Sequence, residues 1–69
     1  MTNWELLYEE MKRKDVSERA LCLGIGRSHG WLHNARKRNS DLKMSDVEKI
    51  CAYMKFSVKQ RYDIFLPAM

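Results

Sequence analysis

Two histidines are the residues of this chain whose spacing most directly suggests chemistry. His29 and His33 stand four residues apart, so a helix would bring both imidazoles to one face, where they could hold a metal ion. The pair lacks a carboxylate or a nearby cysteine that would complete a metal site. Cys22 and Cys51 fall at small-residue positions of predicted helices, which favours structural burial over redox chemistry. We therefore expect no metal site and no other cofactor.

The other side chains form no recognisable catalytic set. Gly24 and Gly26 are followed by no Lys-Ser or Lys-Thr pair, which excludes a phosphate-binding loop of the usual kind. No nucleophile, base and orienting group stand at a sensible spacing, and 69 residues are too few to enclose a substrate pocket. The sequence thus indicates a binding protein rather than an enzyme.

The chain is short, moderately apolar and basic. Its 69 residues are 45% hydrophobic and 32% charged, which predicts one folded domain spanning residues 1–69. No apolar run approaches the roughly 20 residues that a membrane-spanning helix requires, and the first residues do not resemble a signal peptide. Two cysteines are too few for a disulfide scaffold. We therefore expect a cytoplasmic protein with no membrane partner.

Positive charge is concentrated in the middle of the sequence. Residues 19–43 contain six lysines and arginines against Asp41 alone, although the net charge of the whole chain is only +4. A local excess of positive charge is typical of proteins that bind polyanions such as nucleic acids. The alternative, that these residues only keep a small domain soluble, stays open at this point.

The elements that must position these side chains are predicted to be helices, because the chain has only three glycines and one proline. Thr2 and Glu5 have the spacing of a capping box, which predicts a first helix from about residue 3 to 13. Ser17 is the predicted N-cap of a short second helix that ends at two glycines. Ser28 is the predicted N-cap of a third helix, from His29 to about Lys37.

Two further capping boxes predict a fourth and a fifth helix. They are Ser45 with Glu48 and Ser57 with Gln60. Apolar residues at helical spacing give the expected buried faces of the last three helices. These are Leu32 and Ala35; then Val47, Ile50, Cys51 and Met54; then Val58, Tyr62, Phe65 and Leu66, before Pro67. Five short helices with tight connections predict one compact all-α domain.

The second and third helices, joined by a glycine-containing turn, have the arrangement of a helix-turn-helix. The second helix carries apolar or small residues where the third crosses it, and Gly26 is expected to have a positive φ in the turn. The third helix keeps its apolar anchors on one face, so that the other face is available to a DNA major groove. The anchors are Leu21, Cys22 and Ile25 in the second helix and Leu32 and Ala35 in the third.

Nearly the whole chain resembles the lambda-repressor-like helix-turn-helix family, which includes phage Cro and repressor proteins. The matching positions are Val16-Ser17, Leu21-Cys22, Ile25-Gly26, Ser28 and Leu32, followed by Met44, Val47, Ile50-Cys51, Met54 and Phe56-Ser57. Three positions depart from the family pattern: Glu18, where a phosphate-binding glutamine is frequent, Arg27 in the turn, and Gly30 in the third helix. A register that uses Gly24 as the turn glycine is rejected, because two anchor positions would then lack apolar side chains.

The resemblance implies roles for individual residues. Base-edge contacts are expected from Ser28, His29, Asn34 and His33, and contacts to the DNA backbone from Ser17, Arg27, Arg36, Lys37 and Arg38. Trp31 is expected to be a half-buried packing residue rather than a base-stacking one. Ile64, Phe65 and Met69 are the expected dimerisation residues, with Ile64 and Met69 facing outward. The homodimer is expected to be weak and to form on a double-stranded DNA operator.

The sequence therefore predicts a sequence-specific transcriptional regulator resembling Cro or a short repressor, in a bacterial cell or a phage-infected host, with a recognition helix at about residues 28–37. The alternative is a small protein-interaction module, such as a phage inhibitor or an antitoxin-like subunit, that uses an apolar C-terminus. Glu18 and Gly30 favour this alternative, because they weaken the set of DNA-reading residues. The basic segment favours DNA.

Overall fold

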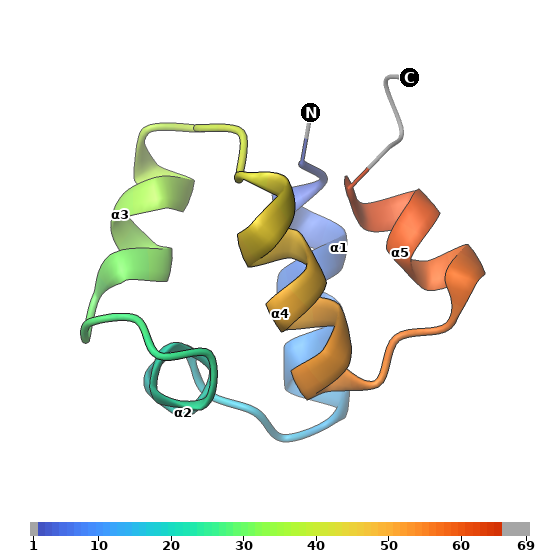
Figure 1. The fold of residues 1–69 in the computed structure, drawn as a ribbon, viewed down its shortest axis with the longest axis horizontal. Coiled ribbons are helices and arrows are strands. Elements are labelled where there is room, and N and C mark those ends of the chain that lie inside the picture. Colours follow the sequence, from blue (N-terminus) through green and yellow to red (C-terminus); the bar gives the residue numbers. More distant parts are fainter. Residues whose placement is uncertain (1, 66–69) are drawn as a thin grey trace.

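The structure is a computed structural model that describes residues 2–65. This part of the chain folds into five α-helices joined by loops (Figure 1). They are α1 (Trp4–Arg13), α2 (Glu18–Gly24), α3 (Trp31–Lys37), α4 (Met44–Met54) and α5 (Val58–Phe65). No strand occurs within this range, which confirms the predicted all-α class. None of these helices combines the length and the apolar character that would let it cross a membrane.

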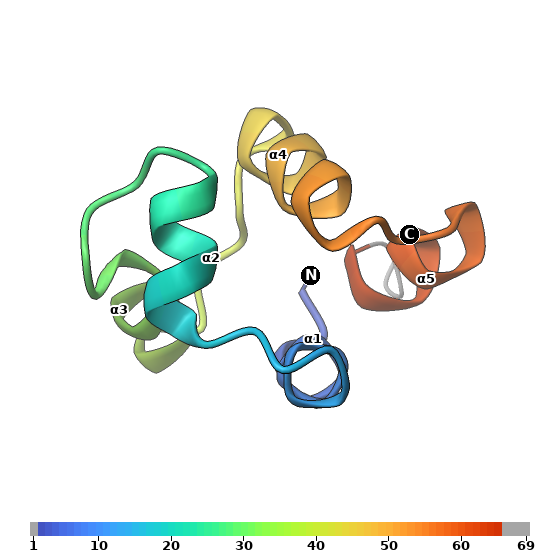
Figure 2. The ribbon, with the colours of Figure 1, turned by 90° about the horizontal axis from the view of Figure 1, so that it is seen from below.

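The helices are arranged around one core. In Figures 1 and 2, α2 and α3 lie together at one end of the molecule and α5 lies at the other, with α1 and α4 between them. Figure 1 looks down the axis of α2, whereas Figure 2 looks nearly down the axis of α3, so the two helices cross steeply. At the opposite end, the backbone N–H of Asn3 donates to the carbonyl oxygen of Ile64 at 2.6 Å, which ties the start of α1 to the end of α5.

Every helix contributes apolar side chains to this core. The buried residues are Trp4, Leu7 and Met11 of α1, Leu21 and Cys22 of α2 with Ile25 after it, Leu32 and Ala35 of α3, Val47, Ile50, Cys51 and Met54 of α4, and Ile64 and Phe65 of α5. The predicted buried faces of α2, α3 and α4 are thereby confirmed. Trp31 is half-buried and packs against the same core, as predicted for it.

Two of the predicted helix caps are present. The Ser17 hydroxyl accepts the backbone N–H of Ala20 at 3.0 Å at the start of α2. Before α5, the Ser57 hydroxyl accepts from the Gln60 backbone at 3.2 Å and the Gln60 side chain accepts from the Ser57 backbone at 2.9 Å. This reciprocal pair is a complete capping box, in which two backbone donors without partners inside the helix are satisfied.

The other predicted capping boxes are not formed. Asn3, not Thr2, caps α1, because its side chain accepts the backbone N–H of Leu6 at 3.0 Å. α4 begins at Met44 with Lys43 in the cap position, so Ser45 already lies inside the first turn and cannot cap it. Both errors are shifts of one or two residues, and the extents of the helices are otherwise close to the predicted ones.

The buried face of α5 agrees with the prediction only at Phe65, and Leu66, also predicted on that face, lies outside the described residues. Ile64 is fully buried and Phe65 is nearly so, whereas Val58 is 84% exposed and Tyr62 is 54% exposed. The inner face is therefore centred on the Ile64 side of the helix and includes the half-buried Gln60 and Arg61. An apolar stripe through Val58 and Tyr62 fitted helical spacing equally well, so periodicity alone chose the wrong face.

Candidate nucleic-acid interface

α3 presents a polar, basic face to solvent. Leu32 is fully buried and Ala35 is 4% exposed, and both point into the core. Successive residues of a helix are rotated by about 100°, so residues 33, 34 and 37 lie on the side opposite these two anchors. The residues there are His33, Asn34 and Lys37, and all three are exposed. This outward face carries an amide, an imidazole and an ammonium group.

The start of α3 differs from the prediction and explains Gly30. The helix begins at Trp31, and Gly30 occupies the cap position with a φ of 90°, a left-handed conformation that favours glycine. The N–H of Trp31 donates to the carbonyl oxygen of Ser28 at 3.1 Å, so Ser28 contributes its backbone rather than a side-chain cap. Ser28 and His29, both exposed, therefore lie in the loop that leads into α3 and not in the helix.

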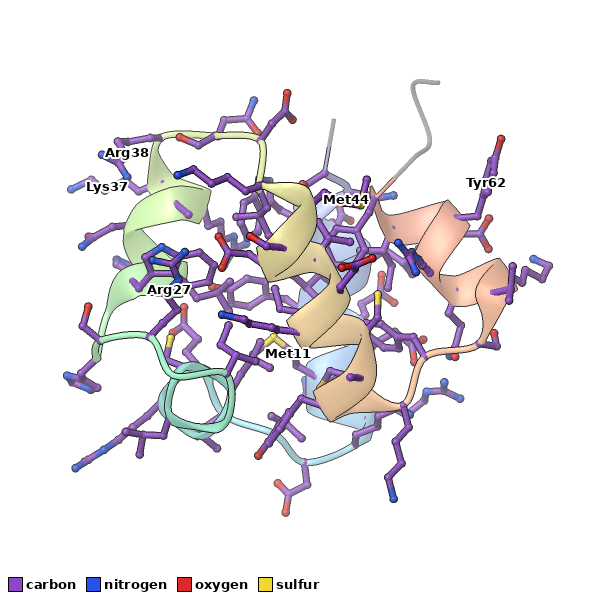
Figure 3. All side chains as sticks on the ribbon, viewed as in Figure 1. Met11, Arg27, Lys37, Arg38, Met44 and Tyr62 are labelled. Atoms are coloured by element: carbon purple, nitrogen blue, oxygen red, sulfur yellow. The ribbon has the colours of Figure 1, made fainter. Side chains whose placement is uncertain are left out.

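Lys37 and Arg38, at the end of α3, are the clearest candidates for binding an anion. Both are exposed, and their side chains point outward from α3 and away from α4 (Figure 3). Within residues 2–65 neither of them forms an ion pair. Arg38 also lines a polar pocket of about 260 Å³ between α3 and the first turn of α4, together with Ser40 and Lys43. This end of α3 is therefore available for contact with a phosphate backbone.

Arg27, expected to contact DNA phosphate, forms an ion pair with Asp46 inside the protein. Its Nη2 donates to both carboxylate oxygens of Asp46, at 2.7 and 2.8 Å, and its Nε donates to Oδ1 at 3.1 Å. The Asp46 side chain is only 4% exposed, and the Arg27 guanidinium also lies 4.9 Å from the centre of the Trp31 ring. Asp46 thus occupies the Nε and Nη2 groups of Arg27, and the expected contact of Arg27 with the DNA backbone stays a prediction.

Arg36 and His33 belong to a second polar cluster, on the flank of α3 that faces α1 and α2. The Arg36 guanidinium lies 4.2 Å from the centre of the Tyr8 ring, and the Tyr8 hydroxyl donates to the Glu18 carboxylate. His33 Nδ1 lies 3.7 Å from the same carboxylate. Burial, together with the neighbouring Glu18, raises the pKa of Tyr8 well above its ordinary value, although Arg36 opposes that shift. The phenol therefore stays protonated and keeps its role as donor.

The Glu18 carboxylate thus accepts a hydrogen bond from Tyr8 and also lies beside His33 of the outward face. Arg36 is still exposed, yet one face of its guanidinium covers an aromatic ring. The Ser17 hydroxyl, a predicted backbone contact, already accepts a hydrogen bond as the cap of α2. Of the predicted backbone-contacting residues, Lys37 and Arg38 are therefore the two whose cationic groups have no partner within residues 2–65.

No metal centre is formed in the part of the chain that the structure describes, where no three potential ligand residues gather. His29 precedes α3 and His33 lies within it, so the two histidines do not share a helical face. Cys22 and Cys51 are buried free thiols, and burial raises the pKa of Cys51. These groups carry structural roles and add nothing to the basic face.

Of the predicted dimerisation residues, the two that the structure describes, Ile64 and Phe65, do not form an outward surface. Ile64 and Phe65 are buried because they supply the inner face of α5, and Met69 lies outside the described residues. The expectation that Ile64 faces outward is therefore wrong. The exposed apolar residues of α5 are Val58 and Tyr62.

The sequence predicts Tyr8 on the apolar face of the first helix and indicates no polar role for Tyr8 or Asp46. A signal for Asp46 existed, because it stands one turn before Ile50 on the predicted buried face of α4. A carboxylate on an apolar face requires a cation nearby.

In comparisons with known proteins, no protein family model, curated protein or solved structure matches the chain.

Proposed function

We propose that this chain is a sequence-specific double-stranded DNA-binding regulator of transcription, resembling the lambda-repressor-like family, with α3 as the recognition helix in the major groove. The observation that carries the proposal is the outward face of α3, where Asn34 and Lys37 are exposed beside Arg38. Nothing within residues 2–65 pairs with the two cations. A helix with one apolar edge and one basic, amide-bearing edge suits a groove lined by phosphates.

Each exposed group on this face has a partner in duplex DNA. The Asn34 side chain can donate its amide N–H to N7 of adenine and accept from the N6 amino group with its carbonyl oxygen, in a bidentate pair. Lys37, near the middle of the outward face, can donate to the O6 and N7 acceptors of guanine. His33 and His29 can donate to the same acceptors, and Arg38 can bind phosphate. Lys37 thus changes from an expected backbone contact to a base-reading candidate.

The arrangement of α2 and α3 supports a helix-turn-helix-like mode of docking. The two helices cross steeply and pack against each other, and a glycine with positive φ, Gly26 at 79°, follows α2 as the turn requires. The connecting loop, residues 25–30, is longer than the three or four residues that are usual in the motif. The longer loop places Ser28 and His29 ahead of the helix, where they would approach the groove edge.

A single short recognition helix reads only a few base pairs, so useful specificity needs two copies on a two-fold operator. We therefore include a weak homodimer, formed on DNA, in the proposal. The apolar surface that α5 leaves exposed, Val58 and Tyr62, is the better candidate for the contact now that Ile64 is known to be buried. Such a regulator would act in the cytoplasm of a bacterial cell or a phage-infected host.

Selection of bound sites from a random duplex library tests the proposal directly. A DNA reader should enrich one short motif and should bind it with a steep decline in affinity as salt rises. Lys37→Gln should flatten the preference at one motif position, whereas Lys59→Gln, a charge-matched change at an exposed position of α5, should leave the motif unchanged. Recovery of no motif, together with no retention on nonspecific duplex at low salt, would contradict the proposal.

One observation favours the rival function, a small protein-interaction module. Three large apolar or aromatic residues are mostly exposed to solvent, which is unusual in so small a domain. They are Leu23 at 66%, Val58 at 84% and Tyr62 at 54%. These three residues lie on α2 and α5 and not on the outward face of α3. The two functions separate experimentally, because only a DNA reader loses affinity when Asn34 and Lys37 are changed and keeps it when Val58 and Tyr62 are changed.

A further inference from the structure

Arg27 stands where the loop between α2 and α3 meets α4. The loop side chains differ sharply in their environment: Ile25 belongs to the core, whereas Ser28 and His29 are exposed. Within the described residues, Arg27 is the only loop side chain that forms an ion pair with another element, through its three hydrogen bonds to Asp46 of α4. It is therefore the polar link between the loop and the rest of the domain.

The same guanidinium also touches the beginning of α3. It lies 4.9 Å from the centre of the ring of Trp31, which is the first residue of the helix. Gly26 and Gly30, with φ of 79° and 90°, stand on either side of Arg27 and Ser28 in the loop. A Cβ at either glycine would meet no atom within 4 Å, so the backbone conformation and not crowding requires them. Two glycines with positive φ thus border residues 27–29, the segment that contains Arg27.

Because of this pairing, Arg27 has few N–H donors left for a phosphate. The edge formed by Nε and Nη2 is fully used by Asp46, whose side chain is 4% exposed. A buried carboxylate must keep its cation, because an unpaired charge in that position is strongly unfavourable. The pair as a whole is neutral, so it releases no counterion when DNA binds.

From these contacts we propose that Arg27 is a positioning residue for DNA reading: it sets where α3 begins and holds the loop with His29 against α4, and it does not neutralise a DNA phosphate. The part that concerns DNA rests on the proposed function. The part that concerns loop order does not, since it is a property of the free protein.

Loop order is tested by amide hydrogen exchange on the full chain, with Arg27→Lys and Arg38→Lys as a matched pair. Lysine keeps the charge but cannot donate a bidentate pair or stack as a guanidinium does. Arg27→Lys should speed exchange of the backbone amides at positions 27 and 31 by about tenfold, while α1 and α5 stay protected. Arg38→Lys should leave those two amides unchanged. Equal protection in both variants would overturn the positioning role.

The phosphate question is tested by the salt dependence of binding to a random-sequence duplex. The double variant Arg27→Gln with Asp46→Asn replaces a neutral pair by a neutral pair, and Arg38→Gln removes one exposed cation. The slope of log K against log salt should be unchanged for the double variant and shallower by about 0.9 for Arg38→Gln. A slope reduced by about 0.9 in the double variant as well would show that Arg27 contacts phosphate and would refute the proposal.

The hydrogen-exchange experiment and the DNA-binding experiment can fail independently of each other. If the wild-type protein binds no duplex, the proposed function fails, and the exchange measurement still decides whether Arg27 orders the loop. If duplex binds but the backbone amides at positions 27 and 31 exchange equally fast in Arg27→Lys and wild type, the positioning role fails and DNA binding stands.

Discussion

Asn34 and Arg38 lie one helical turn apart, yet we expect them to contribute differently to DNA binding. Asn34→Ala should lose about 1–3 kcal/mol on the cognate site and relax one position of the selected motif, because a bidentate base contact disappears. Arg38→Ala should weaken all sequences alike and lower the salt slope by about one. Titrations of cognate and random duplex at several salt concentrations measure both effects. Identical behaviour of the two variants on both duplexes would contradict this division.

Cys51 provides a prediction that depends on pH. Burial is the largest cause of its raised pKa, so the folded protein favours the neutral thiol over the thiolate. The stability that follows is fully present below the unfolded thiol pKa of about 8.5 and is lost as pH rises through the higher folded value.

We expect Cys51 to resist Ellman's reagent at pH 8 in the folded protein and to react rapidly in urea. Cys22→Ala removes the second thiol, which is also buried, and isolates the signal. A thiol that reacts in the native state as fast as a free cysteine would show that the α4 face is open at this point.

Residue types were readable from the sequence, but pairings were not. The basic segment and the exposed Asn34 were found in advance, because charge and helical periodicity are local properties. That Arg27 faces Asp46, nineteen positions away, depends on how α4 crosses the loop. The same is true of Arg36 over Tyr8. Long-range geometry therefore decided which predicted phosphate contacts remained available.

At the scale of elements, Gly30 occupies the cap position of α3. Its φ of 90° disfavours any residue with a Cβ, so Gly30→Ala should destabilise the domain by about 1–2 kcal/mol. Ser28→Ala is the control, and it should change stability by less than about 0.5 kcal/mol, because Ser28 does not cap the helix. Urea unfolding followed by circular dichroism measures both. A loss of about 1 kcal/mol for Ser28→Ala would restore the predicted cap instead.

α3 is held to the domain mainly by Leu32, which is fully buried. Leu32→Ala should cost about 2–5 kcal/mol, a large part of the stability of so small a domain. Leu23→Ala, at a site 66% exposed, is the matched control and should be close to neutral. The two midpoints of urea unfolding make the comparison. Similar midpoints would mean that the assigned anchor of α3 is wrong.

Helix extents were predictable because capping residues and apolar spacing are encoded within a few positions. The capping box of Ser57 and Gln60 and the cap at Ser17 are examples. The starts of α1, α3 and α4 were misplaced, since Thr2, Ser28 and Ser45 are also plausible caps and tertiary packing selected a neighbour. The face of α5 was misjudged for a related reason: several apolar residues compete for one interior.

At the scale of the whole molecule, the burial of Ile64 changes the test for self-association. Tyr62→Asp alters an exposed residue of α5 and should abolish cooperative binding to an operator with two half-sites, while leaving affinity for one half-site unchanged. Ile64→Asp would place a charge in the core and should unfold the protein. Binding curves on single and double half-sites give the readout. Cooperativity that survives Tyr62→Asp would point to another surface or to a monomeric reader.

The placement of the two tryptophans has an optical consequence. Trp4 is buried in the core between α1 and its neighbours, whereas Trp31 is half-buried beside the outward face of α3, beneath the Arg27 guanidinium. The fluorescence of Trp4 therefore reports whether the core is folded, and the fluorescence of Trp31 reports binding at the α3 surface. A chain carrying Trp4→Phe would report occupancy of that surface through its single remaining tryptophan, without any attached dye.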